Sequence, residues 1–242
     1  MKQKLPVFDW STLDRKTLSQ NILGLKPYII DKNLSVSEIH KFLSKTIKSN
    51  YPVIVSKNYS SEVEQGLIYI GGVYYSDKDQ EKQKCIEIQL VYNNPKDKIT
   101  IDSKRLKRMG VCFADTFLHE IIHMRQFRRR KFKYLPDYAS NAEKREQRQE
   151  QSYLGSSDEI DAYGFNIACE MNEKFKGDVG NIVRYLDSKT RKRRHSCWVM
   201  YLKAFDYDHN HKIIKRLKKK IIRYLPNAAF GKPYKNKDWI DR

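Results

Sequence analysis

The chain of 242 residues carries a formal net charge of +19, and 32% of its residues are charged. This length allows one hydrophobic core with an appendage, and the mean hydropathy of −0.76 indicates a strongly hydrated surface. No apolar run reaches the ~20 residues of a membrane-spanning helix, and residues 1–10 contain no hydrophobic signal region. We therefore expect a cytosolic protein without a transmembrane segment.

The cysteines are widely separated and form no Cys-x-x-Cys pair: Cys85, Cys112, Cys169 and Cys197. Such spacing indicates neither a disulfide framework nor a zinc site built from thiolates. We expect buried free thiols, and any metal site must be built from other side chains.

The first strongly periodic segment covers residues 35–49. Its apolar side chains recur at the spacing of one helix face, and Ser35 or Ser37 is placed to cap its N-terminus. Runs rich in β-branched and aromatic residues follow as candidate strands: residues 51–55, 67–75, 85–92 and, as a short fourth, 99–101. Gly71 and Gly72 interrupt the second run and predict a bulge or a bend. A helix followed by a small sheet predicts an α+β fold.

The most specific pattern in the chain is the run His119-Glu120-Ile121-Ile122-His123. It matches the His-Glu-x-x-His pattern that zinc hydrolases carry on a helix. Side chains four positions apart project from one face of a helix, so the imidazoles of His119 and His123 can reach one metal ion. Glu120 then lies beside the metal, where a general base for a zinc-activated water belongs.

The residues around this pattern predict an amphipathic helix. One arc of the helix is filled by apolar side chains: Val111, Ala114, Phe117, Leu118, Ile121, Ile122 and Met124. The two histidines and Glu120 fall outside that arc, which leaves them available to a metal. The alternative is a surface helix whose histidine and glutamate side chains are solvated or hydrogen-bonded to each other.

A catalytic zinc needs three protein ligands and an open position for water, so a third donor is expected on a neighbouring element. Residues 157–171 predict a second helix, with Glu159 and Tyr163 one turn apart on its polar stripe. Glu159 is the main candidate for the third ligand, and Asp158 and Asp161 are the alternatives. The serine three residues before Glu159 also fits a capping box, in which Glu159 would serve only the helix N-terminus.

With these two helices the chain resembles the zinc metallopeptidases of the His-Glu-x-x-His type with a downstream glutamate ligand, the gluzincin-like group. The run from Asp158 to Tyr163 is also similar to a motif in small metallopeptidases encoded by tailed bacteriophages. The resemblance covers residues 36–171. It implies a minimal zincin-like fold: a backing helix, a small mixed sheet, the His-Glu-x-x-His helix and a ligand helix.

The same resemblance implies peptide-bond hydrolysis with Zn²⁺ as the cofactor. Its ligands would be His119, His123 and Glu159, and Glu120 would be the general base. Tyr163 is a further catalytic candidate, as a hydrogen-bond donor to the oxyanion. The expected organisation is an N-terminal arm, a zincin-like metallopeptidase domain and a basic, all-helical C-terminal region: residues 1–34, 35–176 and 177–242.

The positive charge gathers in clusters: residues 125–133, 189–194 and 212–223. Residues 212–225 predict an amphipathic helix that Pro226 is expected to end. Its apolar stripe can dock on the body of the protein, while the alternatives are a surface for nucleic-acid phosphates and a helix lying on a membrane surface. The charge predicts weak, sequence-independent nucleic-acid binding through the last two clusters.

We expect a zinc metallopeptidase that acts on a protein or peptide substrate. If a phage encodes it, the protein would act in the host cytoplasm or be associated with the virion. The alternative is a basic nucleic-acid-binding protein or a virion or assembly component, with a zincin-like scaffold and a structural or vestigial metal site. Glu120 favours the enzyme, because a structural zinc site needs no general base. The sequence does not define the oligomeric state.

Overall fold

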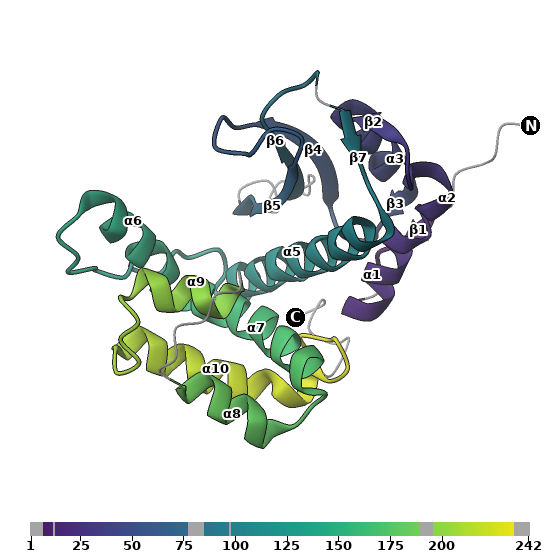
Figure 1. Cartoon of the computed structure of the whole chain (residues 1–242). Helices are drawn as coiled ribbons and strands as arrows, with labels where there is room; N and C mark the ends of the chain where they lie inside the picture. Colours follow the sequence, from purple (N-terminus) through teal and green to yellow (C-terminus); the bar gives the residue numbers. More distant parts are fainter. Residues whose placement is uncertain (1–6, 12, 77–84, 97, 189–195, 235–242) are drawn as a thin grey trace, which may run out of the picture. The chain divides into compact units, whose positions relative to one another are not determined.

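The computed structural model describes residues 7–11, 13–76, 85–96, 98–188 and 196–234 (Figure 1). The chain separates into two compact units, Met1–Met124 and Arg125–Arg242. Helices and short strands together give the mixed α+β class that the sequence predicts. Within the described ranges, no helix combines the length and the hydropathy that a membrane span requires. The predicted boundaries after residues 34 and 176 stay predictions.

The first unit begins with β1 (Phe8–Asp9), α1 (Arg15–Leu23), α2 (Lys26–Ile29) and β2 (Asn33–Ser35). Asp14 caps α1 by accepting a hydrogen bond from the backbone N–H of Thr17 at 2.8 Å. Trp10 is fully buried, and its ring meets the rings of Phe113 and Phe117 at centroid distances of 6.0 and 5.0 Å. The segment predicted as an N-terminal arm therefore contributes to the core of this unit.

The predicted backing helix is confirmed as α3 (Val36–Thr46). Ser35 and Glu38 form a capping box, in which each side chain accepts from the backbone N–H of the other residue. The helix buries its apolar face, and it is followed by β3 (Ile47–Lys48), which pairs with β1 in parallel. Local sequence thus fixes where this helix begins, and its apolar periodicity fixes which face is buried.

The main sheet of the first unit has the strand order β4-β6-β5, from β4 (Val53–Tyr59), β6 (Ile86–Tyr92) and β5 (Ile68–Tyr74). β4 runs parallel to β6, whereas β5 runs antiparallel to it. The predicted short fourth strand is β7 (Lys98–Thr100), but it pairs with β2 in a separate sheet. The sheet is therefore small and mixed, as predicted, with β5 as one of its outer strands.

The bulge predicted at Gly71 and Gly72 is wrong, because both residues pair with β6 in unbroken register, opposite Gln89 and Ile88. Of the two glycines, only Gly72 lies where a side chain would clash with a neighbouring element. A Cβ atom at this position would lie 2.5 Å from Cγ2 of Thr116 on α5 (Ser103–Arg129). Close approach of strand and helix, rather than a bend, explains why this position has no side chain.

The helix α5 carries the His-Glu-x-x-His run and packs on α1 as well as on the sheet. Arg15 of α1 forms a two-pronged ion pair with Asp115 of α5, in which Nη2 lies 2.9 Å from Oδ2 and Nε contacts the other oxygen. The guanidinium of Arg15 is almost fully buried. A buried and paired charge of this kind holds two helices in a defined register.

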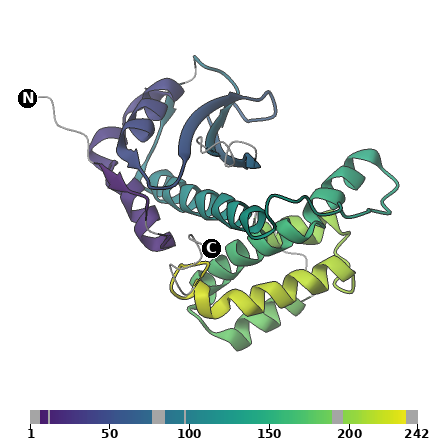
Figure 2. The same cartoon turned by 180° about the vertical axis from the view of Figure 1, so that it is seen from behind.

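The described part of the second unit is helical, which agrees with an all-helical C-terminal region. It contains the end of α5 and the helices α6 (Arg145–Leu154), α7 (Ser157–Phe175), α8 (Val179–Asp187), α9 (Cys197–Ala204) and α10 (Lys212–Ala228). Figures 1 and 2 show α10 running alongside α7 and α8. A Cβ atom on Gly164 of α7 would lie 2.9 Å from Cβ of Lys220, so this glycine allows the helices to approach closely.

The amphipathic helix at the C-terminus docks its apolar stripe. The stripe is buried to 5% exposure or less: Ile214, Leu217, Ile221 and Leu225. Pro226 does not end the helix as predicted, because α10 continues to Ala228. A proline so near the C-terminus removes one hydrogen bond, to the carbonyl of the exposed Ile222, which water can hydrate. All four cysteines are free, as expected, but only Cys85 and Cys169 are buried, whereas Cys112 and Cys197 are partly exposed.

Candidate metal centre

The helix α5 places His119 and His123 one turn apart on regular helix, with Glu120 directly after His119. The two imidazole rings lie 4.7 Å apart between centroids, so they share one face. His119 and Glu120 are each only 6% exposed. The alternative of a surface helix with solvated histidine and glutamate side chains is therefore wrong. Buried imidazole and carboxylate groups require hydrogen-bonding or metal partners.

The environment of Glu120 includes the strand β5. A Cβ atom on Gly72 would lie 2.7 Å from Oε1 and 2.9 Å from Cγ of Glu120, which is closer than ordinary packing allows. The absence of a side chain at Gly72 thus leaves the volume in which the Glu120 carboxylate lies. The outer strand of the sheet passes directly beside the predicted general base.

The acidic residues that compete with Glu159 for the role of ligand have other partners. Both oxygens of Asp158 accept from the guanidinium of Arg130, each at 2.7 Å. Asp161 accepts from Nζ of Lys220 at 2.5 Å and from the hydroxyl of Tyr224 at 3.1 Å. Two carboxylates held in ion pairs are poor candidates for metal binding, because a metal would have to displace their cations.

The beginning of α7 accounts for the position of Glu159. The hydroxyl of Ser156 accepts from the backbone N–H of Glu159 at 3.2 Å. The backbone N–H of Ser156, which the glutamate would bind in a full capping box, donates to the carbonyl of Tyr153 at 3.1 Å. Only the serine half of the predicted box is therefore described, and Glu159 is 8% exposed.

Tyrosine side chains surround Glu159 within the second unit. Burial raises the pKa of Tyr153, and the nearby Tyr163 and Glu159 raise it further, partly through a hydrogen bond to the Glu159 carboxylate. Burial also raises the pKa of Tyr201, with Glu159 as the next contribution. The rings of Tyr163 and Tyr201 lie 5.5 Å apart. At neutral pH the phenols of Tyr153 and Tyr201 therefore keep their protons, and a protonated phenol can donate a hydrogen bond to a carboxylate.

Sequence reasoning singled out Tyr163 but missed Tyr153 and Tyr201. Tyr153 belongs to α6 and Tyr201 to α9, so no spacing within the ligand helix points to them. Tyr153 is 52% exposed as a whole residue, although its hydroxyl end reaches Glu159. Only the packing of separate helices identifies such neighbours.

The predicted ligand side chains form a compact set. Suitable ligand atoms of His119, His123 and Glu159 all lie within 4.8 Å of one another. Two imidazole nitrogens and one carboxylate oxygen form a donor set that Zn²⁺ accepts, and three protein ligands are typical of catalytic sites. The residues present therefore fit a zinc ion.

Two further histidines, His209 and His211, lie against aromatic side chains in the second unit. The ring of His211 stacks on Phe205 at 4.6 Å, and its Nδ1 accepts from the backbone N–H of Ile213 at the start of α10. His209 lies 6.3 Å from the ring of Trp198.

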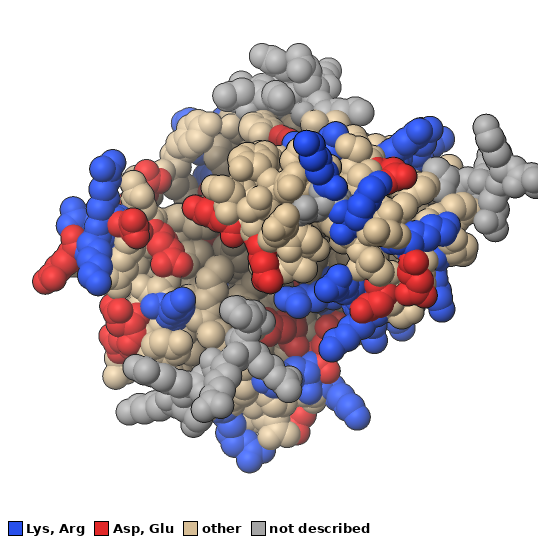
Figure 3. Space-filling view, turned by 45° about the horizontal axis from the view of Figure 1, so that its top comes forward, with Lys and Arg blue, Asp and Glu red and all other residues tan. Residues whose placement is uncertain are grey.

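The basic clusters differ in how much of them the structure describes. Residues 189–194 lie outside the described residues. On α10, Lys218 pairs with Asp187 at 2.8 Å, and Arg216 donates to the hydroxyl of Ser157 at 3.0 Å. On the face in Figure 3, basic and acidic side chains are interspersed. Part of the charge of α10 is thus neutralised or held within the unit.

Comparisons of the chain with protein-family models, with curated proteins and with solved structures found no match. The function proposed below therefore rests on the residues and their geometry.

Proposed function

We propose that the protein is a zinc-dependent metallopeptidase with a minimal zincin-like fold. The observation that carries the proposal is the set formed by His119, His123 and Glu159, with ligand atoms within 4.8 Å of one another, next to the buried Glu120. A structural zinc site does not require a carboxylate beside its ligands, whereas a hydrolytic site does. The cofactor would be Zn²⁺, and the substrate would be a protein or a peptide.

The residues of the chain divide the chemistry among them. Zinc, when bound, would supply a Lewis acid that acidifies water and polarises a carbonyl group. The Glu120 carboxylate accepts the proton of the attacking water and returns it to the leaving amine. The hydroxyl of Tyr163 donates to the oxygen on which negative charge develops. Tyr153 orients the Glu159 carboxylate through its hydrogen bond.

The strand β5 offers a way to hold an extended peptide. It is an outer strand of its sheet, and its Gly72 lies beside Glu120. A peptide that adds to this edge through main-chain hydrogen bonds would bring a peptide bond near the general base. This arrangement favours an extended segment of a protein chain as the substrate.

Zinc analysis of purified variants tests the metal site. We expect one zinc ion per chain in the parent protein, and a loss of stoichiometric zinc in His119→Ala, His123→Ala and Glu159→Gln. His209→Ala is the matched control, because its ring packs on Trp198 instead. Retention of zinc with unchanged affinity in Glu159→Gln would assign the third ligand to Asp158 or Asp161 and contradict the proposed set.

The competing function is a basic nucleic-acid-binding or assembly protein with a structural or vestigial metal site. It is favoured by the formal charge of +19. Peptide cleavage by the zinc-loaded protein that Glu120→Gln abolishes would support the peptidase. Full zinc occupancy with no cleavage of a diverse peptide library would support the competing function.

A further inference from the structure

A second site lies wholly within residues 125–234, at the end of α5 and along α10. A pocket of about 290 Å³ is lined mainly by cationic and phenolic side chains: Arg125, Arg129, Lys220, Arg223, Tyr224 and Tyr234. Its volume is near the lower end, about 300 Å³, of pockets that hold small molecules. We propose that this pocket binds the phosphoryl group of an anionic ligand.

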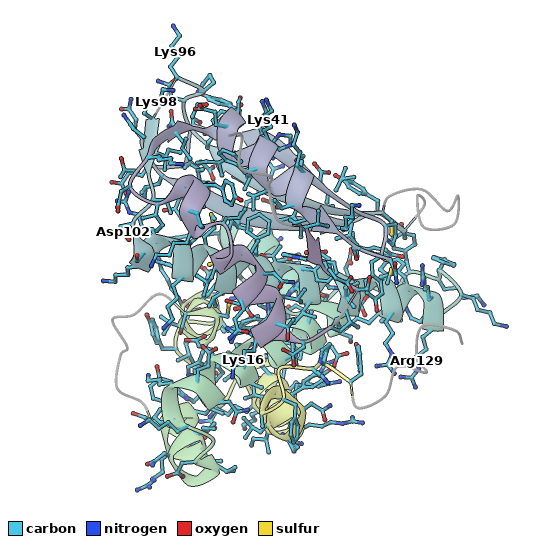
Figure 4. All side chains as sticks on the ribbon, turned by 90° about the vertical axis from the view of Figure 1, so that its right-hand side faces the viewer. Lys16, Lys41, Lys96, Lys98, Asp102 and Arg129 are labelled. Atoms are coloured by element: carbon cyan, nitrogen blue, oxygen red, sulfur yellow. The ribbon has the colours of Figure 1, made fainter. Side chains whose placement is uncertain are left out.

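The pocket walls are fixed by helix geometry. Arg223 and Tyr224 lie three and four positions after Lys220 on α10, so both are neighbours of Lys220 on the helix surface. Arg129, labelled in Figure 4, extends from the C-terminal end of α5. Asn227 donates to the carbonyl of Pro233 at 3.3 Å, which ties the segment after α10 to the helix.

The charges that line the pocket are strongly unbalanced. Among the residues that the structure describes, four basic side chains line the pocket against a single carboxylate, that of Asp161. Lys220 and Tyr224 already donate to this carboxylate, at 2.5 and 3.1 Å. The negative charge of Asp161 therefore balances the positive charge of Lys220. The positive charges of Arg125, Arg129 and Arg223 are not balanced by any other acidic group among the described residues that line the pocket.

The donors suit a tetrahedral oxyanion better than a simple halide. Guanidinium groups present several N–H donors in a planar fork, which matches the spacing of phosphate oxygens. The guanidinium of Arg125 lies 3.6 Å from the ring centre of Tyr234, which orients its fork. Burial raises the pKa of Tyr234 to about 12, so its hydroxyl keeps its proton at neutral pH and can donate.

The size of the pocket limits the ligand to a phosphoryl group with a small substituent. A long tract of duplex nucleic acid would need a surface rather than a pocket of this volume. The phosphoryl group could belong to a free phosphate ester or to the terminal phosphate of a nucleic acid. Both ligands carry the phosphoryl group that the arginines would bind. Competition binding experiments distinguish the two.

Pyrophosphate is the probe for the test, in a phosphate-free buffer of low ionic strength. We expect saturable binding by calorimetry, weakened about tenfold or more in Arg129→Gln/Arg223→Gln, because each lost guanidinium removes a charge-assisted contact. The control is Lys215→Gln/Lys219→Gln, which removes the same charge from exposed positions of α10 that do not line the pocket. Both substituted arginines are exposed, and Arg223→Gln alone serves if the double variant is unstable.

The proposal is overturned if pyrophosphate does not bind saturably, or if both double variants weaken binding equally, since diffuse charge would then explain it. Displacement of pyrophosphate by a nucleoside diphosphate identifies a free ester as the ligand type. Displacement by a short oligonucleotide only when it carries a 5′-phosphate identifies a nucleic-acid end. Neither measurement involves zinc, so repeating the titration in His119→Ala separates this site from the proposed peptidase centre.

Discussion

At the scale of single residues, the candidate centre depends on which carboxylates are held in ion pairs and which carboxylate lies near the two histidines. Asp158 and Asp161 are held by Arg130 and Lys220, whereas Glu159 lies within 4.8 Å of the ligand atoms of both histidines. Adjacent carboxylates on one helix turn therefore have different roles because each faces a different partner. Glu120 and Gly72 form a second such pair, in which the absence of a side chain at Gly72 makes room for the Glu120 carboxylate.

Glu120→Gln should retain zinc and the fold but lose hydrolysis. The amide preserves the shape of the side chain and removes the proton acceptor, so we expect kcat to fall by roughly 10²- to 10⁴-fold. Zinc analysis and cleavage of a fluorogenic peptide library are the measurements. Cleavage at the parental rate by the zinc-loaded variant would show that Glu120 is not the base.

Gly72→Ala should disturb the centre through packing. Its new methyl group would lie 2.5 Å from Thr116 and 2.7 Å from Glu120, so we expect destabilisation by about 1–3 kcal/mol and a loss of peptidase activity. Gly71→Ala is the matched control, because its methyl group would have no neighbour closer than 3.8 Å. Chemical denaturation measures both, and equal stability of the two variants would contradict the packing role of Gly72.

At the scale of elements, the contact of α7 with α10 defines the second unit. Gly164 lets the two helices approach, and the amide of Asn172 donates to the carbonyl of Leu225 at 3.0 Å. The buried stripe of α10 supplies the apolar area of this contact. The apolar face of this strongly basic helix thus has a structural role, and the exposed basic residues Lys215 and Lys219 lie outside the docked face.

Gly164→Ala should destabilise the second unit. The added methyl group would lie 2.9 Å from Cβ of Lys220, and we expect overpacking of about 1–3 kcal/mol to exceed the gain in helix propensity of about 1 kcal/mol. Gly180→Ala, at an exposed position of α8, isolates the propensity gain and should be neutral or slightly stabilising. A thermal midpoint for Gly164→Ala at or above the parental value would show that the contact between α7 and α10 leaves room for a methyl group, which contradicts the close packing proposed here.

At the scale of the whole molecule, the formal charge of +19 remains the dominant property. Part of it is neutralised locally, as in the pairs Lys218–Asp187 and Lys220–Asp161. We expect the excess to attract polyanions, and such attraction depends on released counterions rather than on base sequence. Any nucleic-acid binding outside the phosphoryl pocket should therefore be weak, general and sensitive to salt.

We expect binding to single-stranded and duplex DNA that fades as salt rises. About six to ten phosphate contacts would lower the affinity roughly 10³- to 10⁵-fold between ~50 and ~200 mM salt. The substitution of Lys215, Lys218, Lys219 and Lys220 by glutamine should weaken this binding without changing zinc content. Fluorescence anisotropy measures it, and binding that is independent of salt would rule out a surface of this kind.

The sequence by itself determined the local features of this protein. The cap of α3, the regular helix through His119 and His123, and the docked stripe of α10 follow from side-chain pattern within a few turns, because periodicity decides which face of a helix is buried. The choice of strands also followed from local composition.

Only the tertiary structure decided the features that depend on residues far apart in the sequence. The pairing of β7 with β2, the reason for Gly72, and the partners of Asp158 and Asp161 all join segments with no common pattern. The tyrosines around Glu159 and the cationic pocket arise in the same way, from separate helices. A sequence window records which groups are present, but the packing of the chain decides which of them are neighbours.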